Sequence, residues 1–152
     1  YLGEAVNVAS QFIPKGDVVT YTIDKYENKQ ESKSVGGEAE GMPLVILIDG
    51  GSASASEVVT GALRDYGVGT IIGTNSFGKG VVQQLIEFKD GTGGLKVTTS
   101  KYYTPNGENI HKIGIKPDIV VEIPKELLEG EYNRSTDPQF NKAVEVIKEK
   151  IK

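Results

Sequence analysis

Residues 43–57 restrict the fold of this chain more than any other part of its sequence. A continuous apolar run at 43–48 is typical of a strand that is buried on both faces of an α/β sheet. A turn loosened by glycine follows at 50–54, and apolar residues with helical spacing follow that turn at 58–66. The sequence therefore predicts a strand, a turn and a helix start, where backbone N–H groups can stabilise a developing negative charge.

The same stretch also has a purely structural interpretation. The residues Ser54-Ala55-Ser56-Glu57 fit the S-x-x-E capping box, in which Ser54 does no more than cap the helix. Because helix caps far outnumber nucleophilic serines, the stretch taken alone favours this structural role. The choice between the two interpretations depends on residues farther along the chain.

The remainder of the chain continues the α/β pattern. Apolar residues recur at helical spacing from Leu2 to Ile13, and Pro14 with Gly16 ends that pattern. The other expected elements, in chain order, are a strand at 18–23, a hairpin and exposed loop at 24–41, a strand at 70–72, a hairpin of strands at 81–88 and 95–103, a strand at 119–123, and a helix with Asp137 as N-cap and Pro138 in its first turn. The order strand, helix, strand over 43–72 predicts a right-handed parallel βαβ unit.

Composition narrows the possible functions. The 152 residues suit one domain, and 38% hydrophobic with 25% charged residues describe a soluble globular protein. A net charge of −4 without a long basic run argues against nucleic-acid or anionic-membrane binding. The chain has no cysteine and a single histidine, so thiol catalysis and metal sites built from these residues are excluded, and we expect no cofactor.

A glycine-rich turn at 73–80 resembles a nucleotide-binding loop. Residues 73–79 match G-x-x-x-x-G-K and follow a predicted strand. That motif requires Ser or Thr next, to hold magnesium, and then a helix whose N-terminus binds phosphate. Position 80 is Gly80, and 81–88 has the pattern of a strand, so we regard nucleotide binding at 73–80 as the weaker interpretation.

A Ser-His-Asp hydrolase site also finds little support. Only His111 could act as the base, and it lies in a polar region after a turn. The glycines around Ser54 do not form the G-x-S-x-G elbow. We therefore interpret His111 as a surface residue.

A serine–lysine pair is the third interpretation. A serine hydroxyl is a poor nucleophile until a base removes its proton, and a lysine can do this only in its neutral form. Because a free lysine titrates near ~10.4, such a base needs burial or neighbouring dipoles that disfavour its charge. Lys79 lies between Gly78 and Gly80 with apolar flanks at Phe77 and Val81, a setting that suits a lysine inside the fold, although most lysines are simply solvated.

Several separated motifs carry a resemblance to one known family. In chain order they are 43–48, the GSASASE stretch at 51–57, residues 73–80 with Phe77-Gly78-Lys79-Gly80, Val82-Gln83, YYTPNG at 102–107 and GIKPD at 114–118. The chain resembles the carboxyl-terminal processing proteases, also called tail-specific proteases, of peptidase family S41. The resemblance covers about residues 1–123, and a family-like helix at 137–151 follows. It implies an α/β fold with the spiral sheet core of ClpP- and crotonase-like proteins, flanking helices and a β-hairpin.

The resemblance also selects the site residues. In that family the catalytic serine and lysine lie 25 residues apart, and a glutamine follows the lysine by four. Ser54 and Lys79 have the first spacing (79 − 54 = 25), and Gln83 follows Lys79 by four (83 − 79 = 4). The resemblance thus implies that Ser54 is the nucleophile, that Lys79 is its base and that Gln83 orients Lys79. The backbone N–H of Ala55, the residue after the nucleophile, is the implied oxyanion donor.

One geometric condition accompanies this assignment. Residues four apart on a straight strand lie roughly 13 Å from each other. Lys79 and Gln83 can cooperate only if the backbone bends, and we expect the bend at Gly78 and Gly80.

The resemblance further implies a serine endopeptidase that cleaves polypeptide substrates near their C-termini, outside the bacterial cytoplasm. The family's second oxyanion donor, a glycine in a D-L-R-x-N-x-G-G segment, and its PDZ domain have no counterpart in these residues. We therefore expect a partial catalytic core over 1–152 with weak or no activity alone, and an exposed sheet edge that could support a homo-oligomer. A non-catalytic scaffold or interaction domain with the same fold is the competing interpretation.

Overall fold

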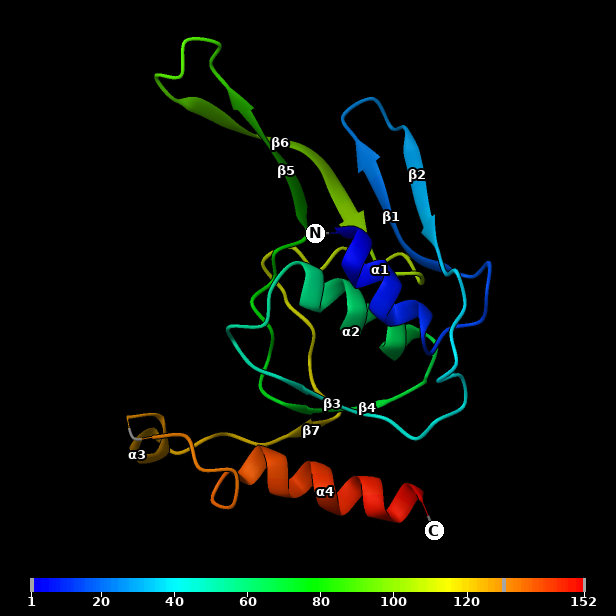
Figure 1. Cartoon of the computed structure of the whole chain (residues 1–152), viewed down its shortest axis with the longest axis vertical. Helices are drawn as coiled ribbons and strands as arrows, with labels where there is room; N and C mark the ends of the chain where they lie inside the picture. Colours follow the sequence, from blue (N-terminus) through cyan, green and yellow to red (C-terminus); the bar gives the residue numbers. More distant parts are fainter. Residues whose placement is uncertain (1, 130, 152) are drawn as a thin grey trace.

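The computed structural model describes residues 2–129 and 131–151 (Figure 1). Its elements, in chain order, are α1 (Leu2–Ser10), β1 (Val18–Asp24), β2 (Lys29–Lys33), β3 (Val45–Ile48), α2 (Ala55–Asp65), β4 (Thr70–Gly73), β5 (Val81–Glu87), β6 (Gly94–Tyr103), β7 (Ile119–Val120), α3 (Lys125–Leu128) and α4 (Pro138–Lys150). The strands form an antiparallel sheet in the order β2-β1-β6-β5 and a parallel sheet in the order β3-β4-β7.

The two sheets lie on opposite sides of a helical layer. Figure 1 shows α1 and α2 side by side between the parallel sheet and the strands of the antiparallel sheet, and α2 packs on both β1 and β4. Helix α4 packs on β3 and β4 from the other side of the parallel sheet. The parallel sheet is therefore covered by helices on both faces, as parallel sheets usually are.

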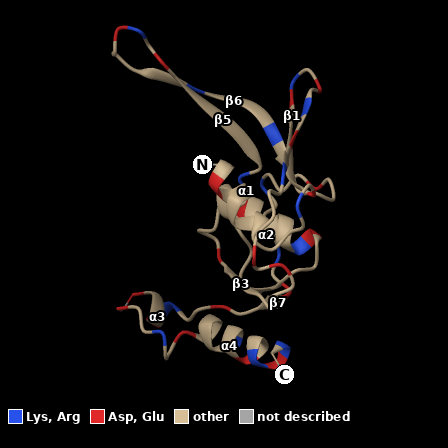
Figure 2. Cartoon of the chain, turned by 45° about the vertical axis from the view of Figure 1, so that its right-hand side comes forward, with Lys and Arg blue, Asp and Glu red and all other residues tan. Residues whose placement is uncertain are grey.

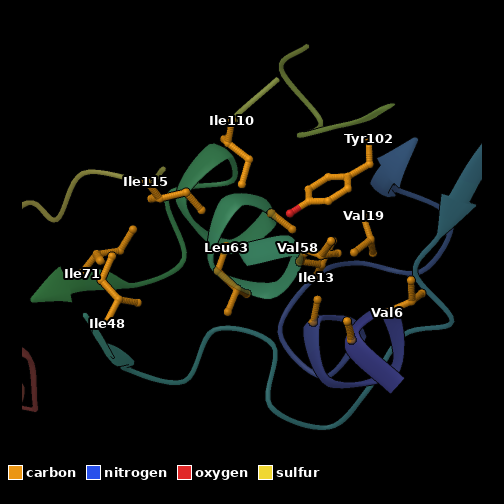
Figure 3. Close-up of a cluster of buried hydrophobic side chains, with 13 residues drawn as sticks. Val6, Ile13, Val19, Ile48, Val58, Leu63, Ile71, Tyr102, Ile110 and Ile115 are labelled. Atoms are coloured by element: carbon orange, nitrogen blue, oxygen red, sulfur yellow. The ribbon is translucent and has the colours of Figure 1, made fainter. Parts of the chain in front are cut away.

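The predicted βαβ unit is present. Strands β3 and β4 pair in parallel, from Val45 opposite Thr70 to Ile48 opposite Gly73, and α2 connects them. Helix α2 ends where expected, because Gly67 adopts a left-handed conformation (φ 65°) directly after its C-cap. The apolar stripe of α2 enters the main core, which is shown in part in Figure 3 and contains Ala5, Val6, Ala9, Ile13, Val19, Ile48, Val58, Ala62, Leu63, Ile71, Tyr102, Ile110 and Ile115.

Helix α1 confirms the prediction for the start of the chain, although it ends at Ser10 rather than near Ile13. The Ser10 hydroxyl donates to the carbonyl of Val6 at 2.7 Å. Ala9 and Ile13 are fully buried, so the segment between Ser10 and Pro14 continues to contribute to the core after the regular helix has ended.

Strand β3 differs from its prediction in one respect. The continuous apolar run predicted burial on both faces, yet the side chain of Leu47 is 41% exposed. Ile48 faces the core, whereas Leu47 points to the opposite face because side chains alternate along a strand. Helix α4 packs on that outer face, and the edge position of β3 leaves Leu47 partly in contact with solvent.

Strands β5 and β6 form the predicted hairpin, which extends from the body of the molecule as an arm (Figure 1). Their register shifts between Val82 and Gln83. Two details at the C-terminal end were not predicted. Strand β7 contains only Ile119–Val120, and the short helix α3 follows it. The predicted N-cap of the last helix is confirmed, because the Asp137 carboxylate accepts from the N–H groups of Gln139 and Phe140.

None of the helices described is long and apolar enough to span a bilayer.

Candidate active site

Ser54 occupies the turn between β3 and α2 in an unusual backbone conformation. Its φ of 54° and ψ of −107° place a residue with a side chain in a region that such residues rarely adopt. Strain of this kind persists only where the surrounding structure holds it, and it concentrates at functional sites. A sharp strand-to-helix turn is also how α/β-hydrolases expose a nucleophilic serine.

Hydrogen bonds accepted by the Asp49 carboxylate hold the first half of this turn. The Asp49 carboxylate accepts from the N–H groups of Gly51 and Ser52 at 2.9 and 3.0 Å. The Ser52 carbonyl then accepts from the N–H of Phe77 at 3.0 Å, which joins the turn to the glycine-rich loop that carries Lys79.

The buried side chain of Glu57 also connects the turn at Ser54 with the glycine-rich loop that carries Lys79. Its side chain is 1% exposed, and its Oε2 accepts from the Ser54 N–H at 2.9 Å, which is the glutamate half of a capping box. The N–H groups of Gly78 and Lys79 donate to the carboxylate at 2.7 and 2.9 Å, and the Ser76 hydroxyl donates at 2.5 Å. One buried carboxylate therefore fixes the backbone at both Ser54 and Lys79. The sequence predicted only its helix-capping half.

The backbone around Lys79 is irregular at Gly78, one of the two glycines at which a bend was expected. Strand β5 begins only at Val81, Gly78 has a φ of 86°, and the register shift beside Gln83 adds a second irregularity. A phosphate-binding loop requires a helix directly after it, but strand β5 follows residues 73–80 instead.

Gly80 admits no side chain without displacing its neighbours. A Cβ built on Gly80 would lie 2.6 Å from the backbone nitrogen of His111. His111 itself is half-buried, and its Nδ1 is buried without a hydrogen-bond partner among the residues described. The prediction that His111 lies at the surface is therefore wrong, because the segment around it packs tightly against the Lys79 loop.

We expect Gly80→Ala to lower the free energy of unfolding by ~1–3 kcal/mol, because the new methyl group meets backbone rather than a movable side chain. Urea denaturation measures this change. Gly3→Ala is the matched control, since nothing lies within 4 Å of a Cβ at that helical position. The control should leave stability unchanged or raise it slightly. Equal effects of the two substitutions would contradict the packing described for Gly80.

One surface cavity of about 270 Å³ brings the predicted site residues together. Its lining includes Ser54, Ala55, Lys79 and Gln83, from the helix start, the glycine-rich loop and β5. Ser54 and Lys79 are half-buried, whereas Gln83 is exposed. His111 is not part of this lining.

Ser54, Lys79 and Gln83 line the same cavity, but no direct catalytic hydrogen bond joins their side chains. In the described part of the chain, Lys79 Nζ donates to neither Ser54 nor Gln83, and the Gln83 amide donates to the Thr98 hydroxyl at 3.4 Å. Catalytic hydrogen bonds are often long before substrate binds, so the roles of these residues stay predictions.

Tyr102 forms a wall of the cavity that the sequence did not identify as functional. It is 4% exposed, and its hydroxyl donates to the Ser54 carbonyl at 3.4 Å. Burial, with the nearby Glu57 carboxylate, raises the pKa of Tyr102 well above its usual range. The phenol therefore keeps its proton and can brace the turn at Ser54. Its position within the YYTPNG motif was the only available signal.

No cluster of three or more His, Cys, Asp or Glu residues suited to a metal ion occurs within residues 2–129 and 131–151.

Comparison with known proteins gives a consistent result. The sequence model of peptidase family S41 matches residues 1–121. The chain is 47% identical over 124 residues to a carboxy-terminal-processing protease of Bartonella bacilliformis, covering 81% of this chain and 28% of that protein. It is 40% identical over 147 residues to a carboxyl-terminal-processing protease of Synechocystis, covering 96% and 34%.

A solved structure agrees. The photosystem II D1 C-terminal processing protease superposes with a TM-score of 0.72 at 36% identity, covering 80% of this chain and 31% of that protein. The expected α/β fold with flanking helices and a β-hairpin is thereby confirmed. The chain spans about a third or less of the length of these relatives.

Proposed function

Because the chain belongs to peptidase family S41, the carboxyl-terminal processing serine proteases, we propose that Ser54 and Lys79 form its catalytic dyad. The observation that carries the proposal is the cavity that both residues line, where Ser54 has a strained backbone conformation. The spacing of 25 residues, shared with the family, supports the same pair. A scaffold without catalysis would have no need of this strain.

The proposed reaction is acyl transfer to water. Neutral Lys79 takes the proton of Ser54 Oγ, and Oγ attacks the carbonyl carbon of a substrate peptide bond. Lys79 passes the proton to the leaving amine as the C–N bond breaks, which leaves an acyl ester on Ser54. Water, deprotonated by Lys79, then attacks the ester, and the released Oγ recovers the proton. Gln83 orients Lys79 in this scheme.

The start of α2 supplies the electrostatic stabilisation of the oxyanion in this scheme. The N–H of Ala55 lies at the N-terminus of an 11-residue helix, where N–H groups have no intrahelical acceptor. We propose that it donates to the oxyanion, assisted by the positive end of the helix dipole. The family's second donor has no counterpart in these 152 residues, and losing one such donor typically costs ~10²–10³ in rate. The proposed activity of these residues alone is accordingly weak.

The wider role follows from the relatives. We propose polypeptide substrates recognised near their C-termini, because the relatives are carboxyl-terminal processing proteases, and a location outside the bacterial cytoplasm. Strand β5 forms one edge of the antiparallel sheet, and self-association through this edge remains part of the proposal.

Cleavage of an unstructured peptide by the 152-residue chain tests the function. We expect slow hydrolysis, followed by mass spectrometry of the products, that Ser54→Ala reduces to the uncatalysed rate. Ser56→Ala is the matched control, since this neighbouring serine is exposed and does not line the cavity. Hydrolysis that persists in Ser54→Ala would contradict the assignment, and rapid hydrolysis by the unmodified chain would contradict the proposal that it is weak alone.

A further inference from the structure

A second lysine, Lys96 on β6, lines the same cavity as Ser54 and Lys79. The register of the β5–β6 hairpin explains why the side chain of Lys96 lies on the same face as Gln83. Lys96 pairs with Leu85, and Thr98 pairs with Gln83. Paired residues lie on one face of a hairpin, and so do residues two apart on a strand, so Lys96 and Gln83 share a face. The hydrogen bond from Gln83 to Thr98 is consistent with this register.

The cavity presents positive charge without a compensating acid. Among the described residues that line it, Lys96 supplies this charge and no carboxylate is present, while Lys79 is neutral in the proposed mechanism. The N-terminus of α2 at Ala55 adds a partial positive charge. Glu57 lies behind the cavity wall, but it is buried and its oxygens already accept from several donors. An anionic group that enters the cavity would therefore be attracted by Lys96 and by the start of α2.

No acidic residue of the β5–β6 hairpin forms an ion pair with Lys96 among the described residues. The acidic residues of the arm, Glu87 and Asp90, lie toward its tip (Figure 2). Glu87 stands one pair farther out on the same face, opposite Gly94, yet no ion pair with Lys96 occurs among the residues described. A lysine that lines a cavity and has no acidic partner among the described residues is suited to pair with a ligand.

We propose that Lys96 binds a carboxylate of the substrate polypeptide and holds it beside Ser54. This subsite rests on the proposed protease function and gives that function a preference for anionic segments near the scissile bond. The carboxylate can come from an Asp or Glu side chain or from the free C-terminus of the polypeptide, since the ammonium of Lys96 would pair with either. Because Lys96 is exposed, the pair should improve binding by about fivefold, the upper end for an exposed ion pair.

Peptide binding to the 152-residue chain tests the subsite. All proteins carry Ser54→Ala, so that no turnover occurs, and binding is followed by fluorescence anisotropy. The probes are three labelled peptides of one unstructured sequence. The first has a central Glu and a free C-terminus, the second has Gln in place of Glu, and the third has a C-terminal amide. We expect the first to bind about fivefold more tightly than one of the other two, and that peptide identifies the source of the carboxylate.

The variants decide whether Lys96 is responsible. Lys96→Gln should abolish the preference and Lys96→Arg should retain it. Lys89→Gln, which changes a lysine at the tip of the same arm, should leave it intact. The preference should also weaken at high salt, which screens an exposed pair. No preference in the protein with Lys96, no binding of any peptide, or a preference unchanged by Lys96→Gln would overturn the proposal.

This measurement is separate from the test of the dyad. A carboxylate preference that depends on Lys96, in a chain whose Ser54 does not attack a peptide, would leave the subsite standing and refute the protease function. Hydrolysis by Ser54 without such a preference would do the reverse.

Discussion

Replacing Lys79 with alanine should slow the attack of Ser54 on a fluorophosphonate by ~10²–10⁴, the usual contribution of a general base. A serine hydroxyl without a base keeps its proton and is a poor nucleophile. The fold should survive the substitution, because the bond that fixes this position is donated by the backbone N–H of Lys79 to Glu57, which alanine retains. The rate is measured as the time course of covalent labelling at a fixed probe concentration.

Lys101→Ala is the control for this experiment. Lys101 is an exposed lysine on β6 that pairs with Val81 and does not line the cavity. Its loss should leave the labelling rate within about twofold. A Lys79→Ala chain that remains folded and is labelled as fast as the unmodified chain would remove Lys79 from the mechanism.

Glu57→Ala should have the largest effect on stability. The substitution leaves the N–H groups of Ser54, Gly78 and Lys79 and the Ser76 hydroxyl without their acceptor in a buried site. Each buried polar group left unpaired costs about 1–3 kcal/mol, although water entering the cavity should relieve part of this loss. We therefore expect the free energy of unfolding in urea to fall by at least ~3 kcal/mol.

Glu57→Ala should also reduce labelling of Ser54 under conditions in which the variant remains folded, because the two loops are no longer joined. Glu108→Ala provides the comparison. Glu108 pairs with Arg64 at 2.6 Å, but its side chain is 44% exposed, and an exposed pair contributes ~1 kcal/mol or less. If Glu57→Ala were no more destabilising than Glu108→Ala, the carboxylate would not be the connection between the loops.

The sequence motifs are sufficient to predict which of these side chains line the cavity. Ser54, Lys79 and Gln83 were selected by spacings shared with a family, and one cavity includes all three. Only one part of the role of Glu57, its hydrogen bond to Ser54, could be predicted from the sequence. Its link to Ser54 is local and follows from the capping-box pattern, whereas its links to Gly78 and Lys79 join positions more than 20 residues away in the sequence. Such bonds exist only once the βαβ unit has brought the two loops together.

The strain at Ser54 could not be predicted for a related reason. Positive φ is ordinarily signalled by glycine, and two glycines stand just before Ser54, where they suggest a loose turn. Hydrogen bonds to Asp49 fix the turn just before Ser54, and the Ser54 N–H itself donates to Glu57, which follows it in the sequence. Similarly, the apolar run of β3 indicated a buried strand, but no pattern within it indicates that the outer face stays partly exposed at Leu47.

Peptide-mapping mass spectrometry after fluorophosphonate treatment tests the proposed dyad most directly. The account predicts a single adduct on Ser54, absent from Lys79→Ala at equal exposure to the probe and retained in Lys101→Ala. An adduct on Ser52 or Ser56 instead of Ser54, or an adduct on Ser54 that forms equally well without Lys79, would contradict it.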